Sequence, residues 1–196
     1  MILRRSVDIA SVEGLEGLSL GRLATELKLS KSGVFSLFGS MEELQLATVR
    51  AAITVFLEHV VVPARRTPVG AARLHGLCER WLAYSRDRVF PGGCFFYSVS
   101  AEFDARPGPV RDTVAAAQVT WRTFVEQTAE EARVAGELRP DTDIPQLVFE
   151  LIAFMETANG ESMLSGDTAV YGRASTAILA RLHTVVTDPS LLPDAP

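Results

Sequence analysis

Apolar side chains recur at every third or fourth position along almost the whole chain, and this spacing constrains the fold more than any other feature. It is typical of amphipathic helices that bury one face. The pattern is clear over residues 49–60, 74–84, 114–132, 144–155 and 174–185. Only residues 94–99 alternate as a strand would, and there the helical pattern continues better into the residues that follow. The sequence therefore predicts an all-α fold.

Proline and glycine divide the pattern into about nine helices, the first three of them very short. We interpret Gly92 and Gly93 as a tight turn before a helix that opens with Cys94. Residues 189–196 are rich in proline and are expected to form a flexible tail.

Composition narrows the class of protein. With 47% hydrophobic and 22% charged residues, the chain should fold into a globule. No stretch is expected to reach the roughly 18 uncharged apolar residues of a membrane helix, so no membrane partner is expected. Cys78 and Cys94 cannot build a disulfide scaffold, which favours a cytoplasmic protein. The net charge of −5 argues against a polyanionic partner, but residues 1–50 are neutral and hold both lysines, Lys28 and Lys31.

Two short helices near the N-terminus carry the first functional signal. Ser19 is a good N-cap for a helix of about two turns, and Lys28-Leu29-Ser30 follows as a three-residue turn. Ser30 can cap a second short helix, on which Val34 and Phe38 share one buried face. This is the helix-turn-helix plan, in which the second helix enters the DNA major groove. A plain helical hairpin with a solvated polar face is the alternative.

Residues 2–56 resemble the N-terminal domain of the TetR/AcrR family of transcriptional regulators. The resemblance rests on an ordered series of matches, which comprises Ile2-Leu3, Ile9-Ala10, Gly14, Gly17, Leu18 to Leu20, Arg22 to Phe38 and Gly39 to Leu44. It implies a three-helix DNA-binding domain over residues 1–46, with residues 31–37 as the recognition helix. The long helix that begins at Met41 would link this domain to a helical-bundle ligand-binding and dimerisation domain over residues 47–188.

The resemblance also implies a duplex DNA operator as partner. Hydroxyls and backbone amides near a helix N-terminus can donate to phosphates, and small side chains let the helix approach the groove. The residues expected to contact DNA are Ser19, Ser30, Lys31, Ser32, Gly33, Phe35, Ser36 and Ser40.

Three positions depart from the family pattern. The family usually has Tyr, His and Lys where this chain has Phe35, Leu37 and Met41, and those residues typically donate to DNA phosphates. Because the replacements have no side-chain donor, affinity and its salt dependence should be lower. The family often has a basic extension ahead of Ile2, and here only Met1 precedes it. Either the chain starts upstream or it binds DNA less tightly than its relatives.

Residues 68–186 resemble the ligand-binding and dimerisation domain of the same family, less specifically. Aromatic residues concentrate there, as they do in pockets between bundle helices. A pocket for a small hydrophobic or aromatic effector is expected, and ordinary core is the alternative for each residue. The expected lining is Trp81, Tyr84, Phe96, Ser100, Trp121, Phe124, Met155 and Asn159.

Apolar stripes near the C-terminus predict a homodimer. Little of the chain remains to cover the stripes on the last two helices, so a second copy would complete a four-helix bundle, as in the family. An intramolecular core is the alternative. The predicted interface residues are Leu147, Leu151, Ala174, Ile178, Leu182 and Val185. A dimer would also present two recognition helices to successive major grooves.

No catalytic residue, cofactor or metal site is expected. His59, His75 and His183 lie on separate helices without partners at metal-ligand spacing, and no phosphate-binding glycine loop occurs. The preferred interpretation is a repressor whose effector favours a dimer geometry that no longer fits the operator. The alternatives are a helical small-molecule-binding protein with weakened or lost DNA binding, and a redox sensor or enzyme based on Cys94.

Overall fold

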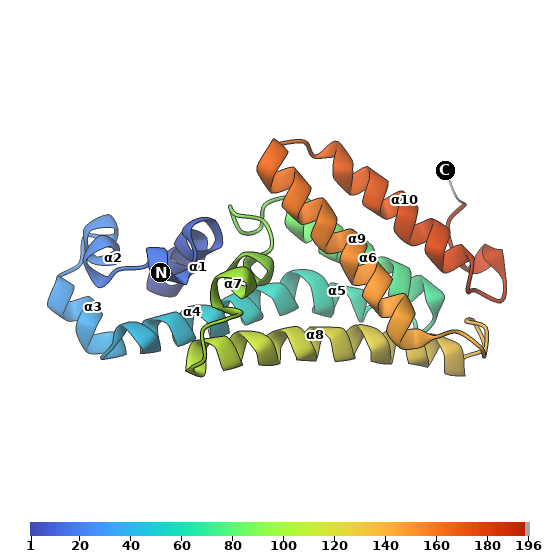
Figure 1. Ribbon diagram of the computed structural model, residues 1–196, viewed down its shortest axis with the longest axis horizontal. Coiled ribbons are helices and arrows are strands. Elements are labelled where there is room, and N and C mark those ends of the chain that lie inside the picture. The colour runs from blue at the N-terminus through green and yellow to red at the C-terminus, as the bar shows by residue number, and fades with distance from the viewer. Residues whose placement is uncertain (195–196) are drawn as a thin grey trace. The chain divides into compact units, whose positions relative to one another are not determined.

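The computed structural model describes residues 1–194, apart from the side chain of Lys31. These residues form the predicted all-α fold, with nine helical runs, because α4, a π-helix and α5 follow one another without a break (Figure 1). The helices are α1 (Ile2–Glu13), α2 (Leu20–Leu27), α3 (Lys31–Phe38), α4 (Met41–Phe56), α5 (Val62–Ala64), α6 (Ala71–Arg86), α7 (Phe95–Phe103), α8 (Pro109–Val134), α9 (Ile144–Ser165) and α10 (Ala169–His183). The π-helix η2 spans Leu57–Val61, and the 3-10 helices η1 and η3 span Leu15–Gly17 and Pro189–Leu191.

Internal contacts divide the chain into two compact units. The first contains Met1–Phe56 and Arg88–Gln118, and the second contains Leu57–Asp87 and Val119–Pro196. The division into domains at residues 1–46, 47–188 and 189–196 stays a prediction. Within the expected flexible tail, η3 is ordered and Leu192 is buried.

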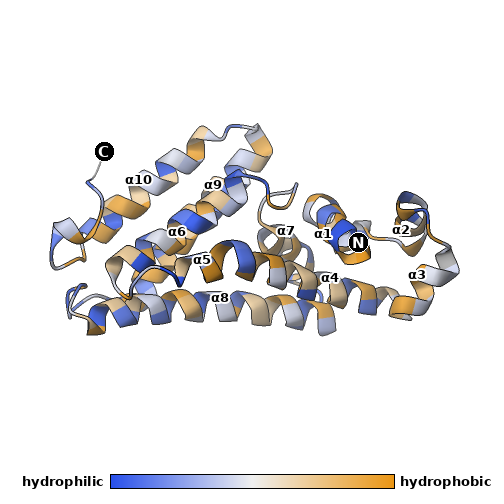
Figure 2. Ribbon diagram, turned by 180° about the vertical axis from the view of Figure 1, so that it is seen from behind, coloured by the Kyte–Doolittle hydropathy of each residue, from blue (hydrophilic) through white to orange (hydrophobic). Residues whose placement is uncertain are grey.

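The core of the first unit is built around α1, which packs against α4 and α7. Most residues buried in this core are apolar, and Figure 2 colours the helices by hydropathy. Ser6, Ser11 and Thr48 are buried polar exceptions. Removing such a side chain from water contributes about 1.5–3 kcal/mol. Buried members of this core include Val7, Ile9, Leu44, Val49 and Phe95.

The segment before α7 lies directly on the backbone of α1, and only glycine fits at the point of contact. The Gly92 N–H donates to Ser11 Oγ at 3.0 Å. A Cβ atom at Gly92 would lie 1.8 Å from the Ser11 carbonyl oxygen. Gly93 has a φ of 77°, so the predicted tight turn is confirmed at this residue. Gly92 serves a different purpose, the close approach of two backbones.

Two carboxylates from distant positions satisfy backbone amides at helix N-termini. In the first unit, Glu102 accepts from the amides of Leu15 and Glu16 at 2.7 and 2.8 Å. In the second unit, Glu137 accepts from the Ala71 amide at 2.7 Å, where α6 begins. Amides at a helix start have no partner within the helix, and a carboxylate also suits the positive end of the helix dipole.

The second unit is a bundle in which α6, α9 and α10 pack against one another. A buried polar cluster joins the three helices. Ser85 Oγ on α6 donates to Asn159 Oδ1 on α9 at 2.8 Å, and it lies 2.7 Å from the hydroxyl of Tyr171 on α10. The segment after α8 is tied to the end of α10, because the Arg139 amide donates to the Val185 carbonyl at 2.8 Å.

The helical run Met41–Ala64 corrects one expectation from composition. Among the described residues it is the single helix long and apolar enough to cross a bilayer by length and composition. A core helix of a soluble protein passes the same test, and in the first unit Leu44, Val49 and Ala52 of this run are buried.

Gly92→Ala should destabilise the fold by more than about 3 kcal/mol, because the added Cβ overlaps a backbone atom of a packed helix. Urea-induced unfolding followed by circular dichroism measures the effect. Gly21→Ala on α2 is the matched control, since nothing lies within 4 Å of its Cβ position. It should stabilise the protein by up to about 1 kcal/mol. Equal stability of Gly92→Ala and the parent would contradict the contact with α1.

Candidate functional site

Helices α2 and α3 form the predicted helix-turn-helix. α2 ends and α3 begins on either side of the three-residue turn Lys28-Leu29-Ser30. Both predicted caps are confirmed. Ser19 Oγ accepts from the Arg22 amide at 3.1 Å, and Ser30 Oγ accepts from the Gly33 amide at 3.0 Å.

Lys28 ends α2 in a left-handed backbone conformation, with φ 55° and ψ 39°. Its amide donates to the Thr25 carbonyl, and the Leu29 amide donates to the Ala24 carbonyl at 2.8 Å. These bonds satisfy carbonyl groups that the helix leaves free. A side chain with a Cβ atom costs about 1 kcal/mol in this conformation, so a glycine would fit the turn better than a lysine.

The face of α3 opposite the buried Val34 is uncovered. Ser32 and Ser36 are exposed on it, and Gly33 is exposed beside them. Phe35 and Leu37, which are 52% and 65% exposed, lie on either side of this row, because successive helical residues are about 100° apart. The surface of α3 is therefore a strip of small residues with an apolar edge on each side.

The serine hydroxyls of this region form hydrogen bonds within the protein. Ser36 Oγ donates to the Gly33 carbonyl at 2.9 Å, and Ser32 Oγ donates to Ser30 Oγ at 3.4 Å. Ser40 Oγ accepts from the Glu43 amide at 3.1 Å at the start of α4. A hydroxyl that accepts from an amide still has a proton to donate, as Ser19, Ser30 and Ser40 do here.

The sequence-predicted DNA contacts gather on one short segment. Seven of the eight are exposed, namely Ser19, Ser30, Ser32, Gly33, Phe35, Ser36 and Ser40. The eighth, Lys31, begins α3, and its side chain lies outside the described part of the chain. Their contact with DNA stays a prediction.

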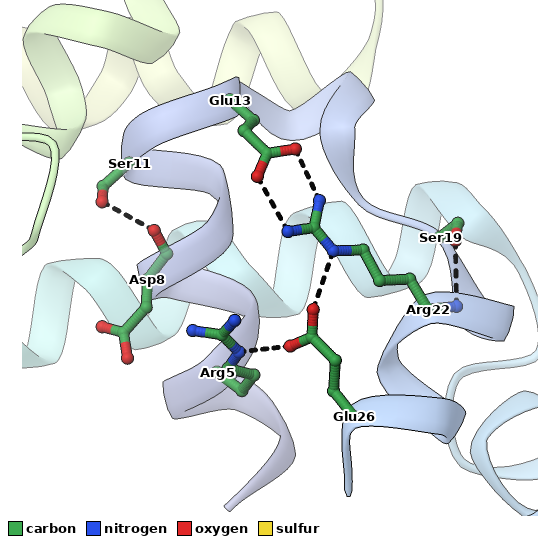
Figure 3. A network of polar contacts seen from close by, with 7 residues as sticks. All are labelled: Arg5, Asp8, Ser11, Glu13, Ser19, Arg22 and Glu26. Atoms are coloured by element: carbon green, nitrogen blue, oxygen red, sulfur yellow. Dashed lines mark hydrogen bonds and ion pairs between the residues drawn. The ribbon is translucent and has the colours of Figure 1, made fainter.

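Ion pairs join α1 to α2 in a continuous chain (Figure 3). Arg22 donates through both terminal nitrogens to the Glu13 carboxylate, and through Nε to Glu26 at 2.9 Å. Arg5 donates to the other carboxylate oxygen of Glu26. These hydrogen bonds, from Arg5 first and then Arg22, lower the pKa of Glu26 to about 2. The network orients α2 on α1 and occupies two arginines within the protein.

Lys28 takes no part in these ion pairs, so its charge is available to a binding partner. Arg4 lies 3.6 Å from Asp8, and Arg50 lies 3.8 Å from Glu43. Among residues with described side chains, no ion pair involves Lys28, which is exposed in the turn. Lys28 is absent from the DNA contacts predicted from sequence, although its clustering with Lys31 was the available signal.

The eight predicted pocket residues are divided between the units, with Phe96 and Ser100 in the first. Phe96 packs edge-on against Phe56 at 5.8 Å between ring centroids, which is an ordinary core contact. Ser100 Oγ accepts from Gln118 Nε2 at 3.0 Å. In the first unit these two residues therefore have local structural roles, and their place in a pocket stays a prediction.

Six predicted pocket residues belong to the second unit. Trp81 and Tyr84 lie 6.3 Å apart, and Trp121 and Phe124 lie 6.4 Å apart, measured between ring centroids. Trp81, Tyr84, Met155 and Asn159 are buried, and Asn159 belongs to the buried polar cluster with Ser85 and Tyr171.

The unit also has a surface hollow of about 380 Å³, but none of the predicted residues lines it. Its lining is Glu126, Gln127, Glu130, Glu131, Ile144 and Pro145.

The six residues predicted for the dimer interface are buried inside the single chain. In the single chain, α6, α9 and α10 pack against one another, and the segment at Arg139 contacts Val185 after α10. The residues buried in this way are Leu147, Leu151, Ala174, Ile178, Leu182 and Val185, each at most 7% exposed. These six side chains therefore have intramolecular partners, and the homodimer itself stays a prediction.

Both thiols are buried, at Cys78 on α6 and at Cys94, which precedes α7. Burial raises the pKa of the Cys78 thiol to about 12, which makes it a poor nucleophile. Within residues 1–194, no three His, Cys, Asp or Glu side chains are grouped so that they could hold a metal ion.

A family model described as the tetracyclin repressor-like C-terminal domain matches residues 70–178, more than half of the chain. The chain therefore belongs to the TetR family of transcriptional regulators, which are not enzymes. None of the curated proteins matches this chain.

Solved structures share the fold over nearly the whole length. A TetR transcriptional regulator from Chloroflexus aurantiacus is 22% identical, with a TM-score of 0.87 over 94% of this chain and 93% of that chain. A regulator from Saccharomonospora viridis, in complex with choline, is 20% identical, with a TM-score of 0.78 over 95% and 96% of the two chains. AibR, in complex with isovaleryl coenzyme A and operator DNA, is 17% identical, with a TM-score of 0.71 over 91% and 96%.

The Glu26 network should make stability depend on pH in the acid range. Because its pKa is lowered in the folded state, Glu26 stabilises the protein fully above its ordinary pKa of 4.5, and the effect is lost as the pH falls toward about 2. Glu26→Gln should lower the thermal unfolding temperature at neutral pH. The difference in unfolding temperature from the parent should vanish as the pH approaches about 2. Glu58→Gln, at an exposed position of η2, is the control and should leave the pH profile unchanged. A constant difference between Glu26→Gln and the parent at all pH values would contradict this role.

Proposed function

We propose that this TetR-family regulator binds a duplex DNA operator as a homodimer, represses transcription, and is released by a small hydrophobic or aromatic effector. The uncovered strip of small residues on α3 is the observation that carries the proposal. A helix with such a face can bring its backbone close to base edges and phosphates in the major groove, which is about 12 Å wide.

Phosphate contacts in this proposal come from the turn and from helix starts. Lys28 supplies a cation, and Ser19, Ser30 and Ser40 have hydroxyl protons to donate from capping positions. The number of such contacts is small, which favours modest affinity and a shallow dependence on salt. A second candidate is a small-molecule-binding protein that has lost DNA binding, favoured by Phe35 and Leu37, which are exposed but have no donor.

The effector part of the proposal is supported by the interior of the second unit. Trp81, Tyr84 and Met155 give α6 and α9 a buried apolar surface, and the cluster around Asn159 offers polar groups. Pockets for drug-sized ligands combine such apolar walls with a few polar groups. The structures with choline and with isovaleryl coenzyme A are examples of this fold with a bound small molecule.

The dimer in this proposal uses the outer faces of α9 and α10 in place of the six buried residues. On α10, Ala169, Gly172, Thr176 and Ala180 are exposed and recur at helical spacing. Small side chains allow two helices to approach closely, and α9 adds Phe149, which is 58% exposed. A two-fold pairing of this face would place two copies of α3 at one operator in the cytoplasm, where regulators of this family act.

Lys28→Gly and Lys28→Ala test the DNA contact and separate charge from backbone strain. Both variants remove the cation, so both should weaken operator binding and flatten the log–log salt dependence by about 0.9 for each phosphate that is no longer neutralised. Only Lys28→Gly should gain stability, by about 1 kcal/mol, because glycine adopts the left-handed conformation without a Cβ penalty. Fluorescence anisotropy with duplexes from the region beside its own gene, over a salt series, measures the first effect, and urea unfolding measures the second.

If both variants keep the salt slope of the parent, Lys28 does not contact phosphate. If the parent binds no duplex even at low salt, the second candidate is correct. Adding candidate aromatic effectors to the same titration tests release from DNA.

Thr176→Arg should convert the proposed dimer to a monomer, because a long charged side chain prevents close approach of α10 to its copy. Sedimentation velocity measures the change, and DNA affinity should fall with it. Val134→Arg is the matched control, since Val134 is 78% exposed at the end of α8. It should leave the oligomeric state unchanged, and a dimer that survives Thr176→Arg would place the interface elsewhere.

A further inference from the structure

Helix α3 has few of the side chains that usually identify bases. Lys31, at its first position, is one of them, and the other seven residues, through Phe38, include no Arg, Asn, Gln, Asp or Glu. Those residues make the paired hydrogen bonds to guanine, adenine and cytosine edges in the major groove. The hydroxyls of Ser32 and Ser36 already donate to Ser30 Oγ and to the Gly33 carbonyl. Sequence preference through hydrogen bonds from this helix is therefore limited.

Helix α3 instead exposes apolar side chains. Phe35 and Leu37 expose 52% and 65% of their surface, whereas Val34 on the same helix is fully buried. Leu29 in the turn adds a third exposed apolar side chain, at 45%. Phe35 and Leu37 border the strip of Ser32, Gly33 and Ser36, so a groove that receives the strip meets both side chains.

The major groove presents one apolar group on its base edges, the C5-methyl of thymine. Against phosphates an apolar side chain gains nothing, since it displaces water from a charged group without replacing the hydrogen bonds. Against a thymine methyl it removes apolar surface of both partners from water, which strengthens binding by about fourfold for each methyl group buried.

We propose that Phe35 and Leu37 are specificity-determining residues, which select operators by packing against thymine methyl groups. The inference rests on the proposed DNA-binding function and adds the chemical feature of the operator that α3 recognises. In a dimer, each subunit contacts one half of the operator. Each half then contains thymine where Phe35 and Leu37 meet the groove, and affinity depends on the methyl group of that thymine.

Replacement of thymine by deoxyuridine tests the proposal, because it removes the methyl group and leaves the base pair intact. Duplexes are first enriched on the full-length protein from a random thymine-containing library at low salt. The enriched duplex is then resynthesised with deoxyuridine at each thymine in turn, and anisotropy gives the affinity of each version. We expect affinity to fall by about fourfold at one or more thymines in each half-site, and to change little elsewhere.

Phe35→Ala combined with Leu37→Ala identifies the side chains responsible. Both positions are more than half exposed, so the double variant should fold, which circular dichroism verifies. It should bind the thymine and deoxyuridine duplexes equally. Val12→Ala, at a 62% exposed position of α1, is the matched control and should retain the parent's preference.

Three outcomes overturn the inference in different ways. Equal affinity of the parent for both duplexes shows that no methyl group is read, while the DNA-binding function stands. A preference for thymine that persists in the double variant assigns it to DNA shape or to other residues. Failure to enrich any duplex at low salt overturns the proposed function together with the inference.

Discussion

The helix-turn-helix depends on the satisfaction of backbone groups at the ends of two very short helices. α2 and α3 have eight residues each, and helices of this length are not stable alone in water. Ser19 and Ser30 cap their starts, and the left-handed Lys28 ends the first of them. Buried contacts of Leu23 and Val34 then fix both helices in the first unit. Every proposed contact with DNA depends on this arrangement.

The electrostatics of the first unit explain why a chain with a net charge of −5 can still offer a nucleic-acid surface. The arginines of residues 1–56 are paired with carboxylates on α1, α2 and α4, as in the Arg5–Glu26–Arg22 chain. The charge that faces outward from the turn is a lysine, and the edges of α3 are apolar. In the proposed complex, the same set of residues makes few phosphate contacts and adds apolar contacts in the groove. Both features predict recognition that depends little on charge.

Sequence-based prediction succeeded where local interactions decide the outcome. Helix periodicity, the caps at Ser19 and Ser30, and the three-residue turn between them all depend on residues within a few positions of one another. It failed where distant segments meet. The apolar stripe through Leu151 and Ile178 looked uncovered along the chain, yet α6 returns to bury it. Periodicity also missed η2, because a π-helix differs from an α-helix by about one residue per turn.

The sequence by itself determined that the chain is helical, where its short N-terminal helices begin and end, and to which family it belongs. Only the tertiary structure decided which faces of these helices are buried inside the protein and which remain open. Gly92 and Lys28 illustrate the reason. Gly92 is needed because a Cβ atom at this position would overlap the α1 backbone. Lys28 is available to a partner, whereas the other described cations of residues 1–56 have carboxylate partners. Such constraints arise between residues that the fold brings together, so spacing along the chain does not reveal them.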